Sequence, residues 1–191
     1  MDSNGSEDSE WTETIRTHRT EKESTFASEA ETPLSETARA QFDGLQFFPI
    51  APEYRVTGRL EVFPEPREAA LEATRGPPMP FEKVGQLGVQ LDGELSVLAV
   101  YRAAGVESLL VPFRDRTNGE TTWRHGRYVT LSAPASIQGA GEHADREKPE
   151  NVTVDFNLAY HPLCVYDETV RSAKPPTDNE LPVAIRAGER R

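Results

Sequence analysis

Two stretches of the sequence concentrate side chains that could bind a ligand or carry out a reaction. The first lies within residues 112–128, where residues 114–127 hold four arginines and one histidine against two acids. This local positive charge contrasts with the formal net charge of −11 of the whole chain. Clustered guanidinium groups hold phosphate or carboxylate through bidentate, charge-assisted hydrogen bonds. The stretch therefore predicts an anion site, with Arg114 and Arg127 as its ligands.

The same arginines have an alternative interpretation that involves no ligand. Arg114, Arg124 and Arg127 lie close in sequence to Asp115 and Glu120, so ion pairs could tie the segment together. We expect this structural role somewhat more strongly than ligand binding.

The second stretch, residues 151–166, alternates apolar and polar side chains. Because successive side chains of a strand point to opposite faces, Thr153, Asp155 and Asn157 should share the face opposite to Val152, Val154 and Phe156. We predict that Asp155, Asn157 and Tyr160 orient a ligand together with Tyr128 of the first stretch. If the protein is an enzyme, Asp155 is a candidate general base, provided that burial or the arginines shift its pKa.

A histidine and the only cysteine stand three residues apart, as His161 and Cys164. This spacing suits a metal site, with Asp155 and His125 as further candidate ligands, but a single pair is a weak signal. Cys164 is also a candidate nucleophile, with a histidine as its base. We favour a third interpretation, in which Cys164 is a small buried apolar residue and His161 forms a hydrogen bond with the backbone, so no metal is predicted.

The periodicity of apolar residues indicates the elements that must position these side chains. Trp11, Ile15, His18, Lys22 and Phe26 fall at helical spacing, which predicts a helix over about residues 10–28. Ser35 predicts the start of a short second helix that ends near Asp43 and Gly44. Strand-like alternation predicts strands over these ranges: 55–62, 87–91, 95–101, 109–113, 127–131, 152–156 and, weakly, 182–185.

Two tight turns are predicted between strands. Asp92-Gly93 should close a hairpin between residues 87–91 and 95–101, and Asn118-Gly119 should form a type I′ turn. The second turn would place Arg114 and Arg116 on one face with the ring of Trp123. Together the elements predict a mainly β fold, an antiparallel sandwich or partly open barrel with an N-terminal helical strap over about residues 10–43.

Composition bounds the organisation and the classes of partner. Residues 1–9 are small and charged, which predicts a disordered acidic tail, and the polar stretch 133–150 predicts a mobile loop within one domain over residues 10–191. The short apolar runs and the polar N-terminus predict neither a membrane span nor a secretory signal, so we expect a cytoplasmic protein. The pI of about 4.9 argues against nucleic-acid binding. The excess of 17 arginines over 4 lysines fits either a salt-adapted cytoplasm or a coding bias.

Together with residues 42–49, the two stretches and the C-terminal segment 175–189 resemble the archaeal and bacterial family called domain of unknown function 1684. The resemblance extends from about Trp11 to Glu189 and rests on three patterns. They are F-R-D-x-T-x-G-x-x-T-aromatic-x-x-G-R-Y at residues 113–128, D-F-N-x-A-Y-N-P-x-C-x-Y at residues 155–166, and P-P-x-x-N-x-L followed by G-E at residues 175–189. His161 stands where the pattern has asparagine, which weakens any zinc site that needs this residue. The resemblance implies an architecture and a site, but no activity.

Two functions from different classes follow. The first is a pocket, lined by the residues above, for a small anionic or polar ligand, with a hydrolase-like reaction as an extension. The second is an interaction or structural module without catalysis, in which the N-terminal helix covers the barrel or docks a partner. No cofactor and no oligomeric state is implied by these residues.

Overall fold

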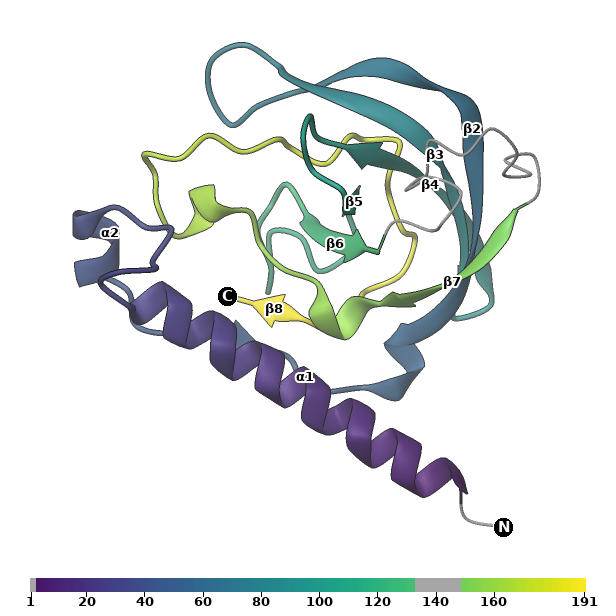
Figure 1. The fold of residues 1–191 in the computed structure, drawn as a ribbon, viewed down its shortest axis with the longest axis horizontal. Coiled ribbons are helices and arrows are strands. Elements are labelled where there is room, and N and C mark those ends of the chain that lie inside the picture. Colours follow the sequence, from purple (N-terminus) through teal and green to yellow (C-terminus); the bar gives the residue numbers. More distant parts are fainter. Residues whose placement is uncertain (1–2, 133–148) are drawn as a thin grey trace.

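The protein is a curled antiparallel sheet with a long N-terminal helix beside it, as seen in a computed structural model (Figure 1). The structure describes residues 3–132 and 149–191, and the side chains from residue 7 onward. The main sheet has the strand order β6-β5-β4-β3-β2-β7. Its strands are β2 (Arg55–Leu71), β3 (Met79–Leu91), β4 (Glu94–Arg102), β5 (Leu109–Phe113), β6 (Arg127–Leu131) and β7 (Glu150–Asp155). The predicted mainly β, partly open barrel with a helical strap is confirmed, in the form of a half-barrel.

A second, very small sheet joins the two ends of the chain. In it, β1 (Gln46–Phe47) pairs antiparallel with β8 (Glu189–Arg190). This sheet was not predicted, because two-residue strands carry no periodicity. The strand predicted over residues 182–185 was wrong, since that segment forms no strand.

The hairpin between β3 and β4 confirms the prediction from Asp92-Gly93. Leu91 pairs with Glu94 across the turn, and both turn residues have a positive φ, 51° for Asp92 and 80° for Gly93. This is the backbone that a type I′ turn requires and that matches the twist of the strands. The two long strands are held in register from this turn outward.

The inside of the half-barrel is a packed core. Alternate side chains of the strands meet there, including Leu60, Leu87, Leu98 and Val111, all of them buried. The C-terminal segment crosses the same space (Figure 1) and adds Leu181, Ile185 and Ala187 to the cluster. The side chains of the strands and of the C-terminal segment thus fill the inside of the half-barrel together, as in small barrels.

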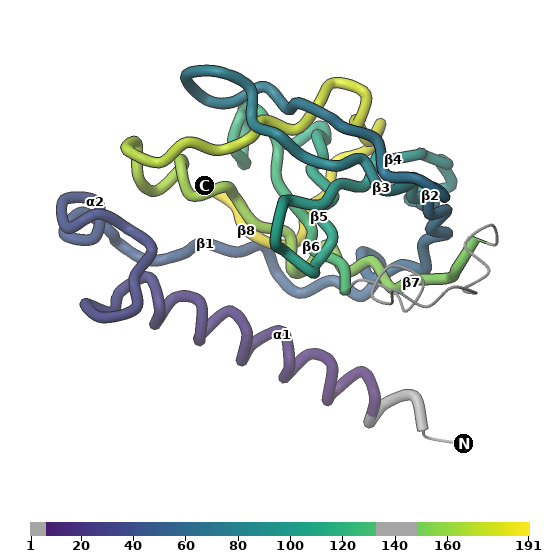
Figure 2. The backbone as a smooth tube through the Cα atoms, turned by 45° about the horizontal axis from the view of Figure 1, so that its top comes forward, coloured from purple at the N-terminus to yellow at the C-terminus, as the bar shows by residue number. Residues whose placement is uncertain are grey.

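The N-terminal helix α1 (Ser3–Ala27) lies along the outside of the half-barrel, next to the strand pair β1/β8 (Figure 2). A helix was predicted over about residues 10–28, but α1 already begins at Ser3. Residues 3–9, which were expected to belong to a disordered acidic tail, are therefore helical. Ile15 and Phe26 are buried, as their spacing predicted, but His18 is exposed and Arg19 takes its place on the inner face. α2 (Glu36–Ala40) is preceded by Ser35, whose side chain accepts from the amide of Ala38 as an N-cap.

In the described part of the chain, three short 3-10 helices lie between strands: Pro52–Tyr54, Phe156–Leu158 and Leu163–Val165. Most of the loop expected over residues 133–150 lies outside the described residues, and its last residue, Glu150, opens β7. No helix in the described part of the chain combines the length and apolarity needed to cross a bilayer.

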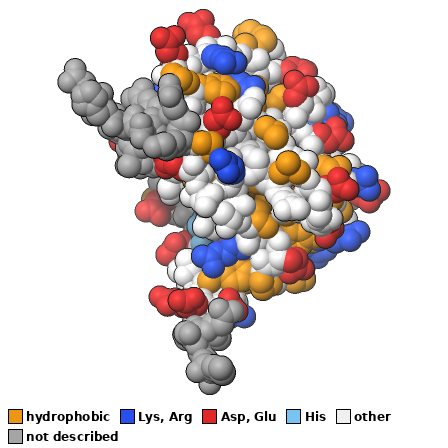
Figure 3. Space-filling model, turned by 90° about the vertical axis from the view of Figure 1, so that its right-hand side faces the viewer, with side chains coloured by type: hydrophobic (Ala, Val, Ile, Leu, Met, Phe, Trp, Pro, Cys, Tyr) orange, Lys and Arg blue, Asp and Glu red, His pale blue; other side chains and the backbone are white. Residues whose placement is uncertain are grey.

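Charges of both signs are interspersed on the face shown in Figure 3, with small apolar groups between them. Three large apolar side chains are exposed among the described residues, Leu95, Val97 and Val106. Leu95 and Val97 belong to the same strand, β4, and Val106 to the loop that follows it. Scattered exposed residues of this kind are ordinary for a folded protein and do not form a broad apolar patch.

Candidate functional site

The inner face of α1 is attached to the barrel by polar side chains as well as by apolar ones. The indole nitrogen of Trp11 donates to Asp155 Oδ2 at 2.7 Å. One turn beyond Ile15, the guanidinium of Arg19 donates to the carbonyl of Phe48 at 2.9 Å and lies 4.6 Å from the ring centre of Phe47. Lys22, one turn further, forms an ion pair with the side-chain carboxylate of Glu189 in β8. The helix is therefore bound to the domain along about three turns, from Trp11 to Lys22.

Asp155 and Asn157, two of the predicted ligand-binding residues, lie side by side but are engaged by the protein. Asp155 Oδ1 caps the following 3-10 helix by accepting from the amide of Asn157 at 2.9 Å. The Asn157 side chain is buried, and it both accepts from the amide of Ala51 and donates to its carbonyl, each at 2.9 Å. With Trp11 on the other oxygen, Asp155 is not placed as a free general base. The pair positions α1 and the loop before β2.

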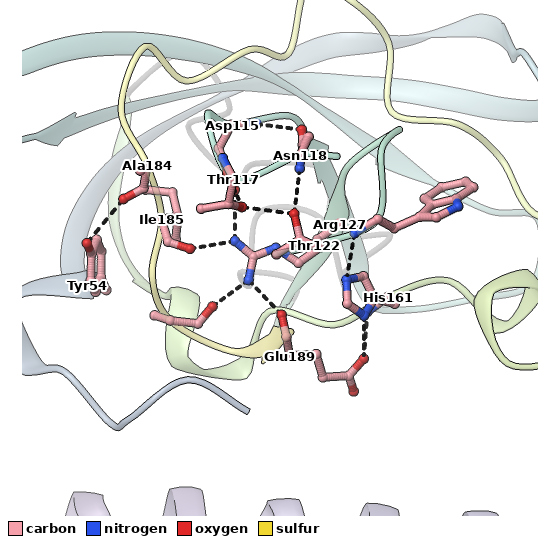
Figure 4. A network of polar contacts seen from close by, with 12 residues as sticks. Tyr54, Asp115, Thr117, Asn118, Thr122, Arg127, His161, Ala184, Ile185 and Glu189 are labelled. Atoms are coloured by element: carbon pink, nitrogen blue, oxygen red, sulfur yellow. Dashed lines mark hydrogen bonds and ion pairs between the residues drawn. The ribbon is translucent and has the colours of Figure 1, made fainter. Parts of the chain in front are cut away.

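Arg127, predicted to bind an anion, is fully buried, with 0% of its side chain exposed. Its Nη2 donates to Asp115 Oδ2 at 2.8 Å and to the carbonyl of Ile185 at 2.7 Å, and its Nη1 donates to the carbonyls of Ala187 and Glu189 (Figure 4). Burial lowers the pKa of the guanidinium, and the carboxylate of Asp115 opposes this. These contacts correspond to the structural alternative for Arg127, which ties the C-terminal segment to β6.

The loop between β5 and β6 is compact, and the hairpin predicted from Asn118-Gly119 was wrong. The carbonyl of Thr117 accepts from the amides of three following residues, Glu120, Thr121 and Thr122, so the chain coils instead of extending. Asp115 supports the coil from inside by accepting from the amide of Thr117 at 2.6 Å. A local side-chain acceptor thus competes successfully with strand pairing, and the predicted stacking of Arg114 and Arg116 on Trp123 does not form.

A glycine sets the direction in which the chain leaves this loop. Gly126 has a φ of 112°, and a Cβ atom there would lie 2.2 Å from the carbonyl oxygen of Phe113. Only glycine fits this close approach. It lets β6 start directly beside the end of β5, with Arg127 pointing into the core.

The two predicted motifs meet through their backbones. The amide of Tyr128 donates to the carbonyl of Tyr160 at 2.9 Å, and the amide of Tyr160 returns a bond of 3.0 Å. Next to this bridge, the amide of Trp123 donates to Nε2 of His161 at 3.1 Å. Sequence-distant segments are therefore joined around the two tyrosines, whose rings contact each other edge to face at 5.6 Å.

His161 belongs to a buried chain of hydrogen bonds. Because Nε2 accepts from Trp123, the ring proton must reside on Nδ1, which lies 3.3 Å from the hydroxyl of Tyr166. That hydroxyl donates to Glu189 Oε2 at 2.7 Å. Burial lowers the pKa of His161 to about 3, so the ring is neutral and its 3.7 Å approach to Glu189 is not an ion pair.

Glu189 is the centre to which these groups and α1 converge. Only 1% of its side chain is exposed, and it accepts from the amide of His161, from Tyr166 and from the ammonium group of Lys22. Its position depends on Gly188, where a Cβ atom would lie 2.4 Å from the carbonyl of Ala159. In the sequence, this Gly-Glu pair is recognisable only as part of the family pattern, and a single buried carboxylate gives no spacing signal that could have revealed its role.

Cys164 and His125 do not join His161 in a reactive or metal-binding group. No cluster of three metal-ligating side chains occurs in the residues that the structure describes. Burial raises the pKa of Cys164, hydrogen bonds from Ser172 and Thr74 oppose this, and the imidazole of His161 is turned to Tyr166. The thiol is thus not activated as a nucleophile would be.

A cavity of about 380 Å³ lies under the C-terminal half of α1 and is called the helix pocket below. It is open to solvent on one side, and α1 contributes Lys22 and Phe26 to its wall. The opposite wall consists of Tyr128, Tyr160, His161, Met79, Phe81, Leu110, Pro162, Leu163 and residues 170–173. Two of the predicted ligand-binding residues, Tyr128 and Tyr160, therefore do line a cavity, whereas the contribution of β3 and of residues 170–173 was missed because nothing in their spacing suggested it.

The hydroxyl groups of the two tyrosines that line the pocket are both engaged in hydrogen bonds. Tyr128 donates to the carbonyl of Ala173, and Tyr160 shares a 3.0 Å hydrogen bond with Thr130. Burial raises the pKa of both phenols, so they are neutral donors at ordinary pH. The Lys22 ammonium lies 4.7 Å from the centre of the Tyr160 ring.

A second, wider cleft of about 1030 Å³ lies between the outer ends of β2 and β3 and the loop around residues 103–107. Its wall contains none of the predicted site residues, whereas Tyr128 and Tyr160 line the helix pocket. We therefore regard the helix pocket as the candidate site.

Comparison with known proteins places the chain among relatives without an assigned activity. Comparison with curated proteins gave no match. The chain is similar to an uncharacterised protein of Haloarcula marismortui with a solution NMR structure, with 32% identity, a TM-score of 0.70 and 97% of each chain covered. Residues 40–190 match the family described as protein of unknown function DUF1684. By this match over most of its length, the chain belongs to the DUF1684 family.

Proposed function

We propose that the protein binds a small molecule with an apolar body and a polar or anionic end in the helix pocket. The observation that supports this most directly is a cavity of about 380 Å³ whose wall combines aliphatic and aromatic side chains with two cations, the ammonium group of Lys22 and the guanidinium group of Arg171. Ligand pockets commonly have volumes of about 300–1,000 Å³ and mostly apolar walls with a few polar groups that fix orientation.

The polar end of the ligand is assigned to Lys22. An ammonium group has three donors, and the ion pair with Glu189 occupies one of them. The remaining donors can bind a carboxylate, sulfonate or carbonyl oxygen, with the Tyr160 ring below the ammonium. In this proposal Lys22 binds the anionic end of the ligand, the role predicted for the arginines from the sequence. Arg127 cannot do so, because its guanidinium already has four acceptors from the protein.

The pocket favours binding over catalysis. Neither Asp155 nor Cys164 lines it, and the neutral His161 in its wall is committed to Trp123 and Tyr166. The competing interaction-module function would use α1 to dock a partner. The contacts of Trp11, Ile15 and Arg19 favour the intramolecular version, in which α1 covers its own barrel.

The proposal is tested with 8-anilinonaphthalene-1-sulfonate, whose fused rings and single sulfonate match the chemistry of the pocket. We expect saturable binding of one molecule per chain to the folded protein, measured by fluorescence and native mass spectrometry. Leu110→Trp should fill the pocket and abolish binding, while Lys22→Met should weaken it. The matched control is Leu95→Trp on the exposed part of β4, which should bind like the original protein.

Thermal melting of each variant establishes that it is folded before binding is compared. Leu110 is half-buried, so a tryptophan there could disturb the fold. Met79→Trp therefore provides a second way to fill the same cavity. The proposal fails if the folded filled variants bind the dye as tightly as the Leu95→Trp control, or if the original protein shows no saturable site.

A further inference from the structure

The helix pocket and the wider cleft meet at one side chain. Among the residues that the structure describes, Phe81 of β3 is the only one that lines both cavities. Its neighbours along the strand divide between them, because Met79 lines only the helix pocket, whereas Pro80 and Glu82 line only the cleft. Phe81 therefore stands where one cavity ends and the other begins.

The ring of Phe81 is held in this place by the sheet around it. It packs edge to face on the ring of Tyr101 in β4, with the ring centres 6.3 Å apart. Its register partner across the strand pair is Ala69 of β2, whose small side chain leaves room for the ring. Behind it lies a buried apolar cluster that includes Leu71 and Ala173. Phe81 thus forms a fixed wall between the two cavities.

From Phe81, the helix pocket extends across the sheet to α1. Its wall takes Leu110 from β5 and Tyr128 from β6. The strand order β6-β5-β4-β3 places Tyr128 three strands from Phe81, which is about 14 Å along the sheet. Beyond Tyr128 lies the ring of Tyr160 at 5.6 Å, and the ammonium of Lys22 lies 4.7 Å from that ring. The pocket is therefore elongated, with an ammonium group at one end and Phe81 at the other.

The charges in the wall favour an anionic group on the ligand. The wall contains two cations, Lys22 and Arg171, and no acidic side chain among the described residues. Arg171 is exposed and donates to the carbonyl of Pro77, next to the turn between β2 and β3. A wall of this kind contrasts with the formal net charge of −11 of the chain and attracts anions over cations.

We propose that the ligand of the helix pocket is a straight-chain amphiphile with a terminal carboxylate, and that Phe81 determines the longest chain that the pocket accepts. This inference rests on the function proposed above for the same pocket. The carboxylate is bound by Lys22, the chain lies over Tyr128 and Leu110, and its far end meets the ring of Phe81. Each methylene that becomes buried should raise the affinity about fourfold, and a methylene that would collide with the ring should add nothing.

The experiment titrates the full-length protein with a series of straight-chain carboxylates, namely hexanoate, octanoate, decanoate, dodecanoate and tetradecanoate, each below its micelle concentration. Displacement of 8-anilinonaphthalene-1-sulfonate measures the affinity. In the original protein, we expect the affinity to rise with chain length and then to level off. Phe81→Ala opens the pocket into the cleft, so the next longer member should bind at least about tenfold more tightly than the last one before it, the effect of two further buried methylenes. Phe81→Leu keeps more of the apolar packing and should move the length limit in the same direction.

The matched control is Met79→Ala, which enlarges the helix pocket from the same strand but does not border the cleft. It should weaken the binding of all members without moving the length limit. Thermal melting verifies that each variant is folded.

The inference is overturned if the folded Phe81 variants keep the length limit of the original protein, if Met79→Ala moves the limit as far, or if the affinity of the original protein does not depend on chain length. In these three cases the dye still binds to the pocket, so the function proposed above stands. Absence of a saturable dye site in the original protein would instead overturn both.

Discussion

The ammonium group of Lys22 in α1 forms an ion pair with the carboxylate of Glu189 in β8, so the first helix is bound to the last strand. Glu189 is almost fully buried, while 20% of the Lys22 side chain remains exposed. The pair also lies beside the helix pocket, because Lys22 forms part of its wall. Attachment of the helix and the electrostatics of the pocket therefore depend on the same contact.

Replacing Lys22 by methionine should destabilise the protein by about 1–3 kcal/mol. The methionine keeps the apolar stem, but the carboxylate of Glu189 loses its counter-charge in a buried place, and the cost is below that of a completely buried pair because Lys22 is partly solvated. Urea unfolding followed by circular dichroism measures the change. Arg16→Met, which removes a pair with 63% and 70% exposed side chains, should cost less than about 1 kcal/mol. Equal losses in both variants would contradict this prediction.

Replacing Arg127 by alanine should cost about 3–5 kcal/mol, enough to unfold a marginally stable protein. The substitution leaves the Asp115 carboxylate buried without its cation and removes every bond to the carbonyls of Ile185, Ala187 and Glu189. Chemical denaturation measures the loss. Arg124→Ala, at an exposed position of the same loop, should change stability by less than about 0.5 kcal/mol. A folded Arg127→Ala protein of unchanged stability would show that the guanidinium does not hold the C-terminal segment.

The fold was largely predictable from local sequence signals, and the exceptions have physical reasons. Alternation at residues 87–101 and the Asp-Gly turn indicate a hairpin because both depend on nearest neighbours along the chain. The same logic failed at Asn118-Gly119, where the Asp115 carboxylate captures the amide of Thr117 and coils the loop. Residues 182–185 alternate like a strand, yet they cross the barrel and bond to Arg127 instead of a neighbouring strand.

The candidate site was predictable only in part. Tyr128 and Tyr160 were identified from their motifs, and they do meet at the helix pocket. Charge alone cannot tell a buried arginine from an available one, so Arg127 and Arg114 looked alike although one has four acceptors and the other has none in the described residues. Lys22 and Glu189 join opposite ends of the chain, and no spacing rule links such positions.

Acid should destabilise the protein through His161. The folded pKa of this residue is lowered to about 3 by burial, whereas an unfolded histidine titrates near 6.5. Below about pH 6.5 the unfolded state binds a proton that the folded state does not, so this contribution is complete above that pH and is lost as the pH falls toward 3. One proton corresponds to a slope of about 1.4 kcal/mol per pH unit.

This slope is measured by urea unfolding at several pH values between 4 and 7. His161→Asn, the residue of the family pattern, should flatten the acid limb by about the slope of one proton, because an amide does not titrate. His18→Asn serves as the comparison. Burial lowers the pKa of His18 as well, but the residue is exposed, so its replacement should flatten the acid limb less than that of His161. An unchanged acid limb in the His161 variant would mean that this ring does not govern the response.

Finally, potassium chloride should stabilise the protein. The chain has a formal net charge of −11, and acids are interspersed over the face in Figure 3. Self-repulsion of this charge opposes folding, and salt screens it with a Debye length of about 3 Å at 1 M. We expect the melting temperature to rise from low to multimolar potassium chloride.

The rise should be smaller for the double variant Glu10→Gln and Glu21→Gln on exposed positions of α1, and larger for Arg186→Gln, which removes an exposed positive charge. If the melting temperature does not depend on salt, the excess of arginine over lysine is explained by coding bias instead of salt adaptation. If it rises equally with salt in the original protein and both variants, net charge is not the cause of the salt dependence.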